Sequence, residues 1–385
     1  MKTFNCNCPD HQVLFFESTQ CVACDRVVGL DDDFDKIEPY DLDEKSGHYF
    51  KAGKPETLYQ KCDNHAKYGA CNGMVNLKTF VPSDVEGEVL CFACRFNEVI
   101  PDLTVVEHIP LWKKMETAKR RAMYTLKVLP LPLNDITQDP EGGLSFDFTT
   151  DRDVNDHFAS KLKNQKAVFT GHNCGHITIN LAEADEVARS HTKLAMGEQY
   201  RTLLGHFRHE LGHYYFDKII VGNPEKHALC KQYFGDDELD YKKAMDKHYK
   251  NGAPKDWSDS FISEYATMHP YEDWAETWAH YMHIMDTLET AQNFSITGSV
   301  RGNSEETEEV GDLYLPQDAY FFSAQTSITS ILDSWVEFSV ILNSLNRSMG
   351  LNDAYPFVLT DSVRGKLSFV HHAIHNRLHR MPSAV

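Results

Sequence analysis

The chain has 385 residues, which is long enough for two domains. Its hydrophobic fraction of 42% is ordinary for a globular protein, and no apolar run approaches the length of a membrane span. Its 38 Lys and Arg residues against 57 Asp and Glu residues give a formal charge of −19. This charge argues against nucleic acid as a partner, because an acidic surface repels phosphate.

Most of the cysteines fall in the first quarter of the chain, in closely spaced pairs that include two CxxC sequences. These cysteines are Cys6, Cys8, Cys21, Cys24, Cys62, Cys71, Cys91 and Cys94. Two sets of four thiolates match the closed tetrahedral shell of structural zinc, and disulfides are the alternative. Residues 1–8 show no apolar signal segment, so we expect a cytoplasmic protein with two structural zinc ions.

The assignment of these cysteines to two sites is open on sequence grounds. The sequential choice joins Cys6, Cys8, Cys21 and Cys24 in one site and Cys62, Cys71, Cys91 and Cys94 in the other, and an interleaved arrangement is the alternative. Cys174 and Cys230 stand apart and are expected to be ordinary buried or free thiols. The sequence predicts a zinc-ribbon domain over residues 1–100, with a structural or substrate-presenting role.

A linker helix is predicted over residues 101–135, centred on 111–129 and ended by Pro130. It carries the chain's one basic cluster, which we interpret as a solvated face that pairs with acidic neighbours. The cluster consists of Lys113, Lys114, Lys119, Arg120 and Arg121. Beyond it, residues 144–148 alternate like a strand, and residues 167–181 predict two strands around a glycine-containing turn.

The most informative motif is an HExxH box formed by His209, Glu210 and His213. On a helix, positions i and i+4 share one face, so the two imidazoles can bind a single metal ion, with Glu210 close enough to act on water. Solvated helix histidines are the alternative interpretation. Gly212 inside this helix costs about 1 kcal/mol relative to alanine, which suggests that some group approaches the backbone closely there, with a neutral glycine as the alternative.

The apolar face of the same helix is predicted from residues at spacings of three and four. These are Leu204, Phe207, Leu211 and Tyr215. The histidines and Glu210 fall largely on the other side, and we therefore expect them to lie outside the buried stripe.

A second helix is predicted to begin at Pro270, whose missing N–H is not needed in a first turn. Glu272 and Glu276 share one face of it, away from an apolar stripe of aromatic residues. Zinc in a catalytic site has three protein ligands, and ligand histidines are oriented by carboxylates. We therefore predict Glu272 as the third zinc ligand and Glu276 as a support for a ligand histidine. Asp217, one turn past His213, is a weaker candidate for such support.

The HExxH helix followed by the Glu-x-x-x-Glu helix resembles the gluzincin class of metallopeptidases. The segments Tyr265-Ala266, His269-Pro270 and Trp278 to Tyr281 resemble the family of zinc-binding metallopeptidases with an N-terminal zinc ribbon, and lethal-factor-type peptidases look like distant relatives. In those relatives, a tyrosine seven positions before the glutamate ligand stabilises the tetrahedral intermediate, and Tyr265 holds that place.

The resemblance implies an α+β protein, with a mostly helical metallopeptidase domain over residues 136–385 that contains a small sheet. An edge strand of that sheet would pair with an extended peptide substrate, and residues 177–181 are our candidate. Helices are also expected at 320–348 and 362–377, with an acidic mobile loop at 298–312.

The sequence thus predicts a zinc-dependent peptidase with one catalytic and two structural zinc ions and a polypeptide substrate. Glu210 would be the general base, and Tyr265 would donate to the oxyanion. Two alternatives stay open: a non-catalytic zinc-ribbon adaptor that binds peptides, and a deconjugase that cuts isopeptide bonds.

Overall fold

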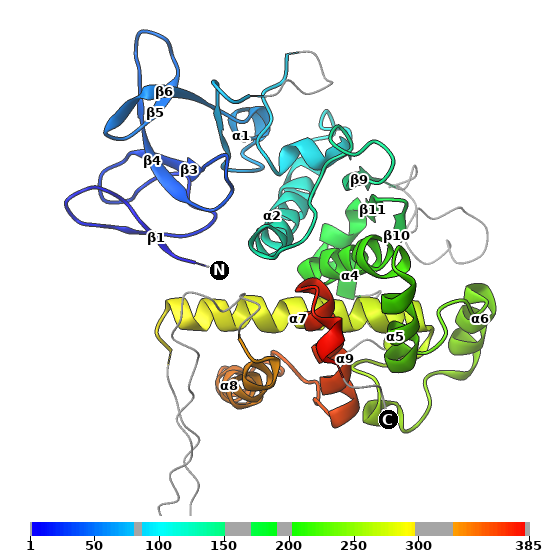
Figure 1. The fold of residues 1–385 in the computed structure, drawn as a ribbon. Coiled ribbons are helices and arrows are strands. Elements are labelled where there is room, and N and C mark those ends of the chain that lie inside the picture. The colour runs from blue at the N-terminus through cyan, green and yellow to red at the C-terminus, as the bar shows by residue number, and fades with distance from the viewer. Residues whose placement is uncertain (1, 81–86, 151–170, 191–201, 297–325, 382–385) are drawn as a thin grey trace, which may run out of the picture. The chain divides into compact units, whose positions relative to one another are not determined.

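The computed structural model describes residues 2–80, 87–150, 171–190, 202–296 and 326–381 (Figure 1). The chain divides into two compact units. The first comprises residues 2–127 and 132–192, and the second comprises residues 128–131 and 193–385. Strands expected in the peptidase domain, between residues 145 and 180, belong by contact to the first unit.

The first unit begins with the cysteine-rich region, which consists of short antiparallel strands and one short helix. A two-stranded sheet pairs β1 with β2, and a five-stranded sheet has the order β3-β4-β5-β6-β7. The elements are β1 (Phe4–Asn5), β2 (Val13–Leu14), β3 (Val27–Leu30), β4 (Ile37–Leu42), β5 (Tyr49–Lys51), β6 (Lys54–Lys61), α1 (Asp63–Tyr68) and β7 (Met74–Asn76).

A small apolar cluster lies on the five-stranded sheet. It contains Tyr40, Tyr59 and Met74, with Tyr49 packed against it. Such short strands bury little apolar surface, and regions of this size usually depend on metals or disulfides for stability. The buried cysteines therefore matter for the stability of this region.

The first unit continues with α2 (His108–Val128) and a four-stranded sheet of order β10-β11-β9-β8. Its strands are β8 (Asn97–Val99), β9 (Ser145–Thr149), β10 (Gly171–Asn173) and β11 (His176–Asn180). The predicted edge strand at residues 177–181 is wrong, because β11 lies between β10 and β9 and both its edges are hydrogen-bonded.

The basic cluster on α2 is less solvated than predicted. Lys119 is fully buried and pairs with Glu116 at 3.0 Å, and Arg120 is buried with a hydrogen bond to Asn72. Arg121 and Lys114 do pair with acidic residues, Glu17 and Glu186, as expected. A buried cation requires a partner, and Glu116 and Asn72 meet that need inside the unit.

The second unit is helical in the part that the structure describes. Its α-helices are α4 (Leu203–Phe216), α5 (Pro224–Phe234), α6 (Tyr241–Asn251), α7 (Pro270–Asn293), α8 (Ile328–Ser348) and α9 (Asp361–Ile374). The helices predicted at 320–348 and 362–377 correspond to α8 and α9, and residues 320–325 of the first prediction lie outside the described residues. The loop predicted at 298–312 lies outside the described residues. Together the two units confirm the α+β class.

Helix α7 is the central element of this unit and contacts α4, α5 and α9 (Figure 1). As predicted, it begins at Pro270, after an N-cap residue, His269, whose side chain accepts a hydrogen bond from the Tyr271 amide. Its aromatic stripe is buried, with Trp274 and Trp278 fully enclosed. None of the helices in the described parts of the chain is both long and apolar enough to cross a membrane.

Candidate metal centre

The candidate site forms where α4 packs against α7. At the contact, an ideal Cβ on Gly212 would lie 2.9 Å from the Ala275 Cα and 3.2 Å from the Trp278 Cβ. The Trp274 indole also donates a hydrogen bond to the Gly212 carbonyl, at 2.8 Å. The predicted close approach at Gly212 is thus confirmed, and it brings the HExxH box to the first turns of α7.

Three side chains from the two helices point their donor atoms at one another. The Nε2 of His209 lies 2.9 Å from Oε2 of Glu272 and 3.1 Å from Nε2 of His213, and the Glu272 oxygen lies 3.4 Å from His213 Nε2. Atoms that ligate zinc at about 2.05 Å in tetrahedral geometry are about 3.3 Å apart. The three distances scatter around that value, so this donor set fits a zinc ion.

The carboxylate of Glu276 hydrogen-bonds to the nitrogen of His209 that does not face the donor cluster. Its Oε1 accepts a hydrogen bond from Nδ1 of His209 at 2.7 Å, and its Oε2 accepts one from the Ser263 hydroxyl at 2.6 Å. This pattern is the usual support of a metal-binding histidine. Among the described residues, Nδ1 of His213 has no hydrogen-bond partner, so the structure shows no hydrogen bond from this ring to Asp217.

The electrostatics of the cluster favour a cation between these residues. Burial disfavours a charged His209 ring, but Glu272 and Glu276 outweigh burial and raise the pKa of His209 well above its usual value. Burial likewise favours a neutral Glu272, yet His213 and His209 hold the pKa of that carboxyl well below its usual range. A field that stabilises a proton on a buried imidazole also stabilises a divalent ion at the same place.

Glu210 lies beside the three donor atoms with one oxygen uncommitted. Its Oε1 is 3.4 Å from Nε2 of His206, and its buried Oε2 has no hydrogen-bond partner among the described residues. Burial alone would raise the pKa of Glu210, but His206 and His209 outweigh it and lower that pKa. The group is therefore a carboxylate at neutral pH, able to accept a proton.

Tyrosines surround the donor atoms, and only one was expected from the sequence. The Tyr265 ring lies 5.8 Å from that of His209, and burial raises its pKa well above the usual value. Tyr271 stacks on His213 with ring centroids 4.1 Å apart, and the Tyr241 hydroxyl donates to Oε1 of Glu272 at 2.8 Å. Tyr271 is next to Glu272 in the sequence, so its place near the site could have been predicted. Tyr241 lies 31 residues before Glu272 and belongs to no motif, so the sequence gives no signal for it.

The expectation that the histidines avoid the buried stripe is wrong. His209 is 9% exposed, Glu210 5% and His213 5%, so they are nearly as buried as the apolar face of α4. The reason is that α7 covers the polar side of this helix with Glu272 and Glu276. A hydropathy pattern on one helix does not reveal that its polar side faces polar groups on another.

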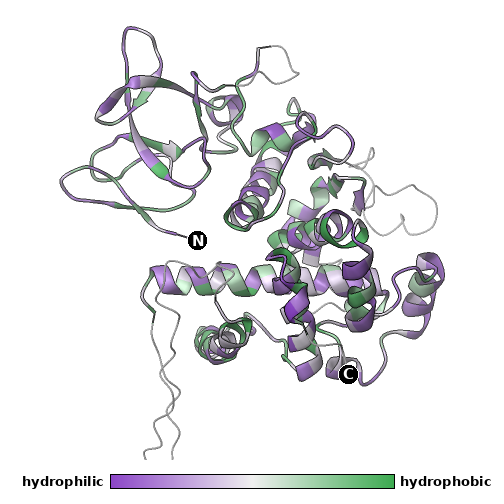
Figure 2. Ribbon diagram, in the orientation of Figure 1, coloured by the Kyte–Doolittle hydropathy of each residue, from purple (hydrophilic) through white to green (hydrophobic). Residues whose placement is uncertain are grey.

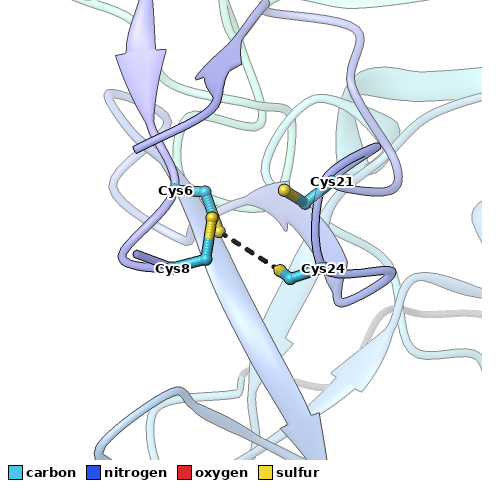
Figure 3. A group of neighbouring side chains, drawn as sticks. All are labelled: Cys6, Cys8, Cys21 and Cys24. Carbon is cyan, nitrogen blue, oxygen red and sulfur yellow. Dashed lines mark hydrogen bonds between the residues drawn. The ribbon is translucent and has the colours of Figure 1, made fainter. Parts of the chain in front are cut away.

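The eight clustered cysteines form two groups of four, in the sequential arrangement. Cys6 and Cys8 face Cys21 and Cys24, and the Sγ atoms of Cys6 and Cys24 are 3.7 Å apart (Figure 3). The second group consists of Cys62, Cys71, Cys91 and Cys94. Sulfurs bound to one zinc ion at about 2.3 Å are about 3.8 Å apart, so the Cys6–Cys24 spacing fits a zinc site.

The cysteines outside these groups play no part in them. Cys174 is exposed, Cys230 is buried, and all ten cysteines are free thiols. A further cluster contains Glu98, Asp147 and His176 of the small sheet. There the His176 ring already lies 2.9 Å from Glu98, and the Glu98 and His176 side chains are both more than 40% exposed. This cluster is an exposed surface contact between an imidazole and two carboxylates.

Comparisons with known proteins agree with the residue evidence. Residues 108–373 match the family described as "Putative zinc-binding metallo-peptidase", and residues 3–105 match a zinc-ribbon domain. Uncharacterized proteins of Mycobacterium tuberculosis and Mycobacterium bovis are 36% identical over 375 residues, which cover 96% of this chain and 94% of theirs. No solved structure matches. The chain therefore belongs to this family of zinc-binding metallopeptidases and carries an N-terminal zinc ribbon.

Proposed function

We propose that this chain is a gluzincin-type zinc peptidase that hydrolyses peptide bonds in a polypeptide substrate. His209, His213 and Glu272 would hold the catalytic zinc, and the two cysteine groups would hold one structural zinc each. The convergence of two imidazole nitrogens and one carboxylate oxygen, within 3.4 Å of one another, is the observation that carries this proposal.

Zinc in a three-ligand site supplies Lewis acidity and lowers the pKa of water to near neutrality. Glu210 would take the proton of the attacking water on its free, buried Oε2 and later give it to the leaving amine. Its lowered pKa supports this role, because the base must be ionised before the reaction. The eight cysteine thiols must stay reduced to bind zinc, which supports a reducing, cytoplasmic location.

Tyr265 would donate its hydroxyl proton to the oxyanion that develops on the scissile carbonyl. Burial and the nearby carboxylate of Glu272 raise its pKa, so the hydroxyl keeps its proton at neutral pH. A donor in this position contributes most when it is fixed before the reaction, and the packing of Tyr265 near His209 supplies that restraint.

The test compares Glu210→Gln and Tyr265→Phe with the wild type on a peptide library, and zinc content is measured on every sample. We expect both variants to keep their zinc, and we expect Glu210→Gln to lose at least about 10²-fold in turnover. Glu225→Gln, at an exposed position in the first turn of α5, is the matched control and should be unchanged. Wild-type turnover in Glu210→Gln would exclude Glu210 as the base. A zinc-loaded wild type with no turnover of any peptide would favour the adaptor alternative.

A further inference from the structure

The first turn of α6 brings a tyrosine to the candidate metal centre. Helix α6 is exposed and mostly hydrophilic, with no fully buried residue (Figure 2). Tyr241 is its first residue, and the preceding residue, Asp240, caps the helix by accepting a hydrogen bond from the Lys243 amide. The Tyr241 side chain turns toward α7, where its ring lies 5.2 Å from that of His269.

A second contact fixes this segment to the start of α7. The Nε2 of His269 hydrogen-bonds to the Leu239 carbonyl at 3.0 Å, and Nδ1 of the same ring accepts from the Tyr271 amide. His269 thus caps α7 and holds the chain just before α6. Because Glu272 lies in the first turn of α7, this arrangement places the Tyr241 hydroxyl beside the Glu272 carboxylate.

The two oxygens of Glu272 have separate partners. Oε2 faces Nε2 of His209 at 2.9 Å and Nε2 of His213 at 3.4 Å, and Oε1 accepts a hydrogen bond from the Tyr241 hydroxyl at 2.8 Å. Glu272 is 2% exposed, so no bulk water competes for either oxygen. The tyrosine hydroxyl therefore determines which oxygen is left for the imidazole cluster.

We infer that Tyr241 is a positioning residue that makes Glu272 a one-oxygen metal ligand. This inference rests on the proposed function, because it assigns a role at the same zinc site. A carboxylate can bind a metal through one or both oxygens, and a hydrogen bond to Oε1 opposes the two-oxygen mode. One-oxygen binding leaves the fourth tetrahedral position open, as a catalytic site requires.

The hydrogen bond also fixes the rotamer of Glu272 before the metal binds. Conformational freedom that is already lost in the metal-free protein does not have to be lost on binding. Partners of this kind behind a metal ligand are typically worth about 10- to 100-fold in metal affinity or activity. Tyr241 would thus support Glu272 as Glu276 supports His209.

The experiment measures the zinc affinity of full-length wild type, Tyr241→Phe and Tyr249→Phe by chelator competition. His209→Ala identifies which bound zinc belongs to this site. We expect Tyr241→Phe to bind this zinc about 10- to 100-fold more weakly. Tyr249→Phe should match the wild type, because it removes a hydroxyl from an exposed side chain of the same helix.

A second readout separates positioning from folding. Tyr241→Phe keeps the ring that packs near His269 and loses the hydrogen bond to Glu272, so its metal-free form should unfold at a somewhat lower temperature but stay fully folded at the temperature of the zinc titration. Unchanged zinc affinity, or weaker binding in a variant that is partly unfolded at the temperature of the titration, would overturn the inference. A wild type that binds no more zinc than His209→Ala would instead refute the proposed zinc site itself, and with it this inference.

Discussion

The Glu276 carboxylate lies 2.7 Å from Nδ1 of His209, on the side of the ring opposite Glu272. Burial alone would raise the pKa of Glu276, but the His209 ring outweighs burial and lowers that pKa. Glu276 is therefore a carboxylate that accepts the Nδ1–H hydrogen bond. With Nδ1–H held by Glu276, Nε2 is the nitrogen that would give up its proton and turn a lone pair to a metal ion, which is the tautomer that metal binding requires.

Replacing Glu276 should weaken this site without removing a donor atom. We expect Glu276→Gln to lower the zinc affinity of the site by about 10- to 100-fold, because His209 loses its anionic partner. Ser263→Ala removes the hydrogen bond to the other Glu276 oxygen and the one that its hydroxyl accepts from the Ala266 amide, but it leaves the charge of Glu276 in place. It should therefore have a smaller effect in the same chelator titration. Equal zinc affinity in Glu276→Gln and wild type would contradict a supporting role for this carboxylate.

A methyl group at Gly212 should disturb the contact between α4 and α7. Its Cβ would lie 2.9 Å from the Ala275 Cα, and overpacking of this kind costs about 1–3 kcal/mol. That cost opposes the gain of about 1 kcal/mol in helix propensity. We expect Gly212→Ala to lower the free energy of unfolding, measured in urea. Gly222→Ala is the control, because nothing lies within 4 Å of its Cβ and its φ is −69°. Equal stability of the two variants would argue against the close contact.

The residue before the HExxH box anchors α4 to the middle of α7. The Arg208 guanidinium donates to Nδ1 of His283 and to the Asp286 carboxylate, and all three side chains are at least nine-tenths buried. Arg208→Met would leave the Asp286 carboxylate buried without its cation, so we expect a loss of about 3–5 kcal/mol in urea unfolding.

The double variant Arg208→Met/Asp286→Asn tests whether the loss of stability comes from the unpaired Asp286 charge. It removes both charges, so it should recover part of the stability that Arg208→Met loses. Additive losses from the two substitutions would show that the charges do not interact.

Buried histidines should make the fold sensitive to acid. Burial, with nearby His375 and Arg377, lowers the pKa of His371 to about 3, and its Nδ1 accepts a hydrogen bond from the Tyr281 hydroxyl. In an unfolded chain the pKa is about 6.5, so between those pH values only the unfolded state gains the proton. The contribution of neutral His371 to the free energy of unfolding is complete above about pH 6.5. As the pH falls from there toward 3, this contribution is lost by about 1.4 kcal/mol per pH unit.

This effect can be measured by urea unfolding of wild type and His371→Gln at several values between about pH 4.5 and 6. Glutamine can still accept a hydrogen bond but does not titrate. The slope of unfolding free energy against pH should fall by about 1.4 kcal/mol per pH unit in the variant. An identical slope would mean that His371 is already charged in the folded protein.

The parts of the site that depend on local spacing could be predicted from the sequence. Helical periodicity alone places His209 near His213 and Glu272 near Glu276, and Pro270 predicts where the second helix begins. The closely spaced cysteine pairs could be predicted in the same way, but which pairs share a site stayed open, because that depends on how the chain folds between the pairs. No such rule applied to Tyr241, whose contact with Glu272 depends on the path of the chain between α5 and α7.

Predictions that needed tertiary structure were less successful. Residues 177–181 are predicted to be an edge strand, but the order of strands in a sheet depends on pairing between distant segments. Here β9 pairs in parallel with one edge of β11, so β11 is not an edge strand. Lys119 looked like a solvated cation, yet it is buried against Glu116. For the strand, the partner comes from a distant part of the chain. For Lys119, the partner lies one turn earlier on the same helix, and only the packing of α2 shows that the pair is buried.

The central claim is that His209, His213 and Glu272 bind a zinc ion distinct from the two cysteine sites. The most direct test is the zinc content of purified wild-type protein beside His209→Ala, each at equal protein concentration and after removal of loosely bound metal. The account predicts three zinc ions per wild-type chain and two per variant chain. Two zinc ions in both proteins would contradict it, because the cysteine groups alone would then account for all the metal.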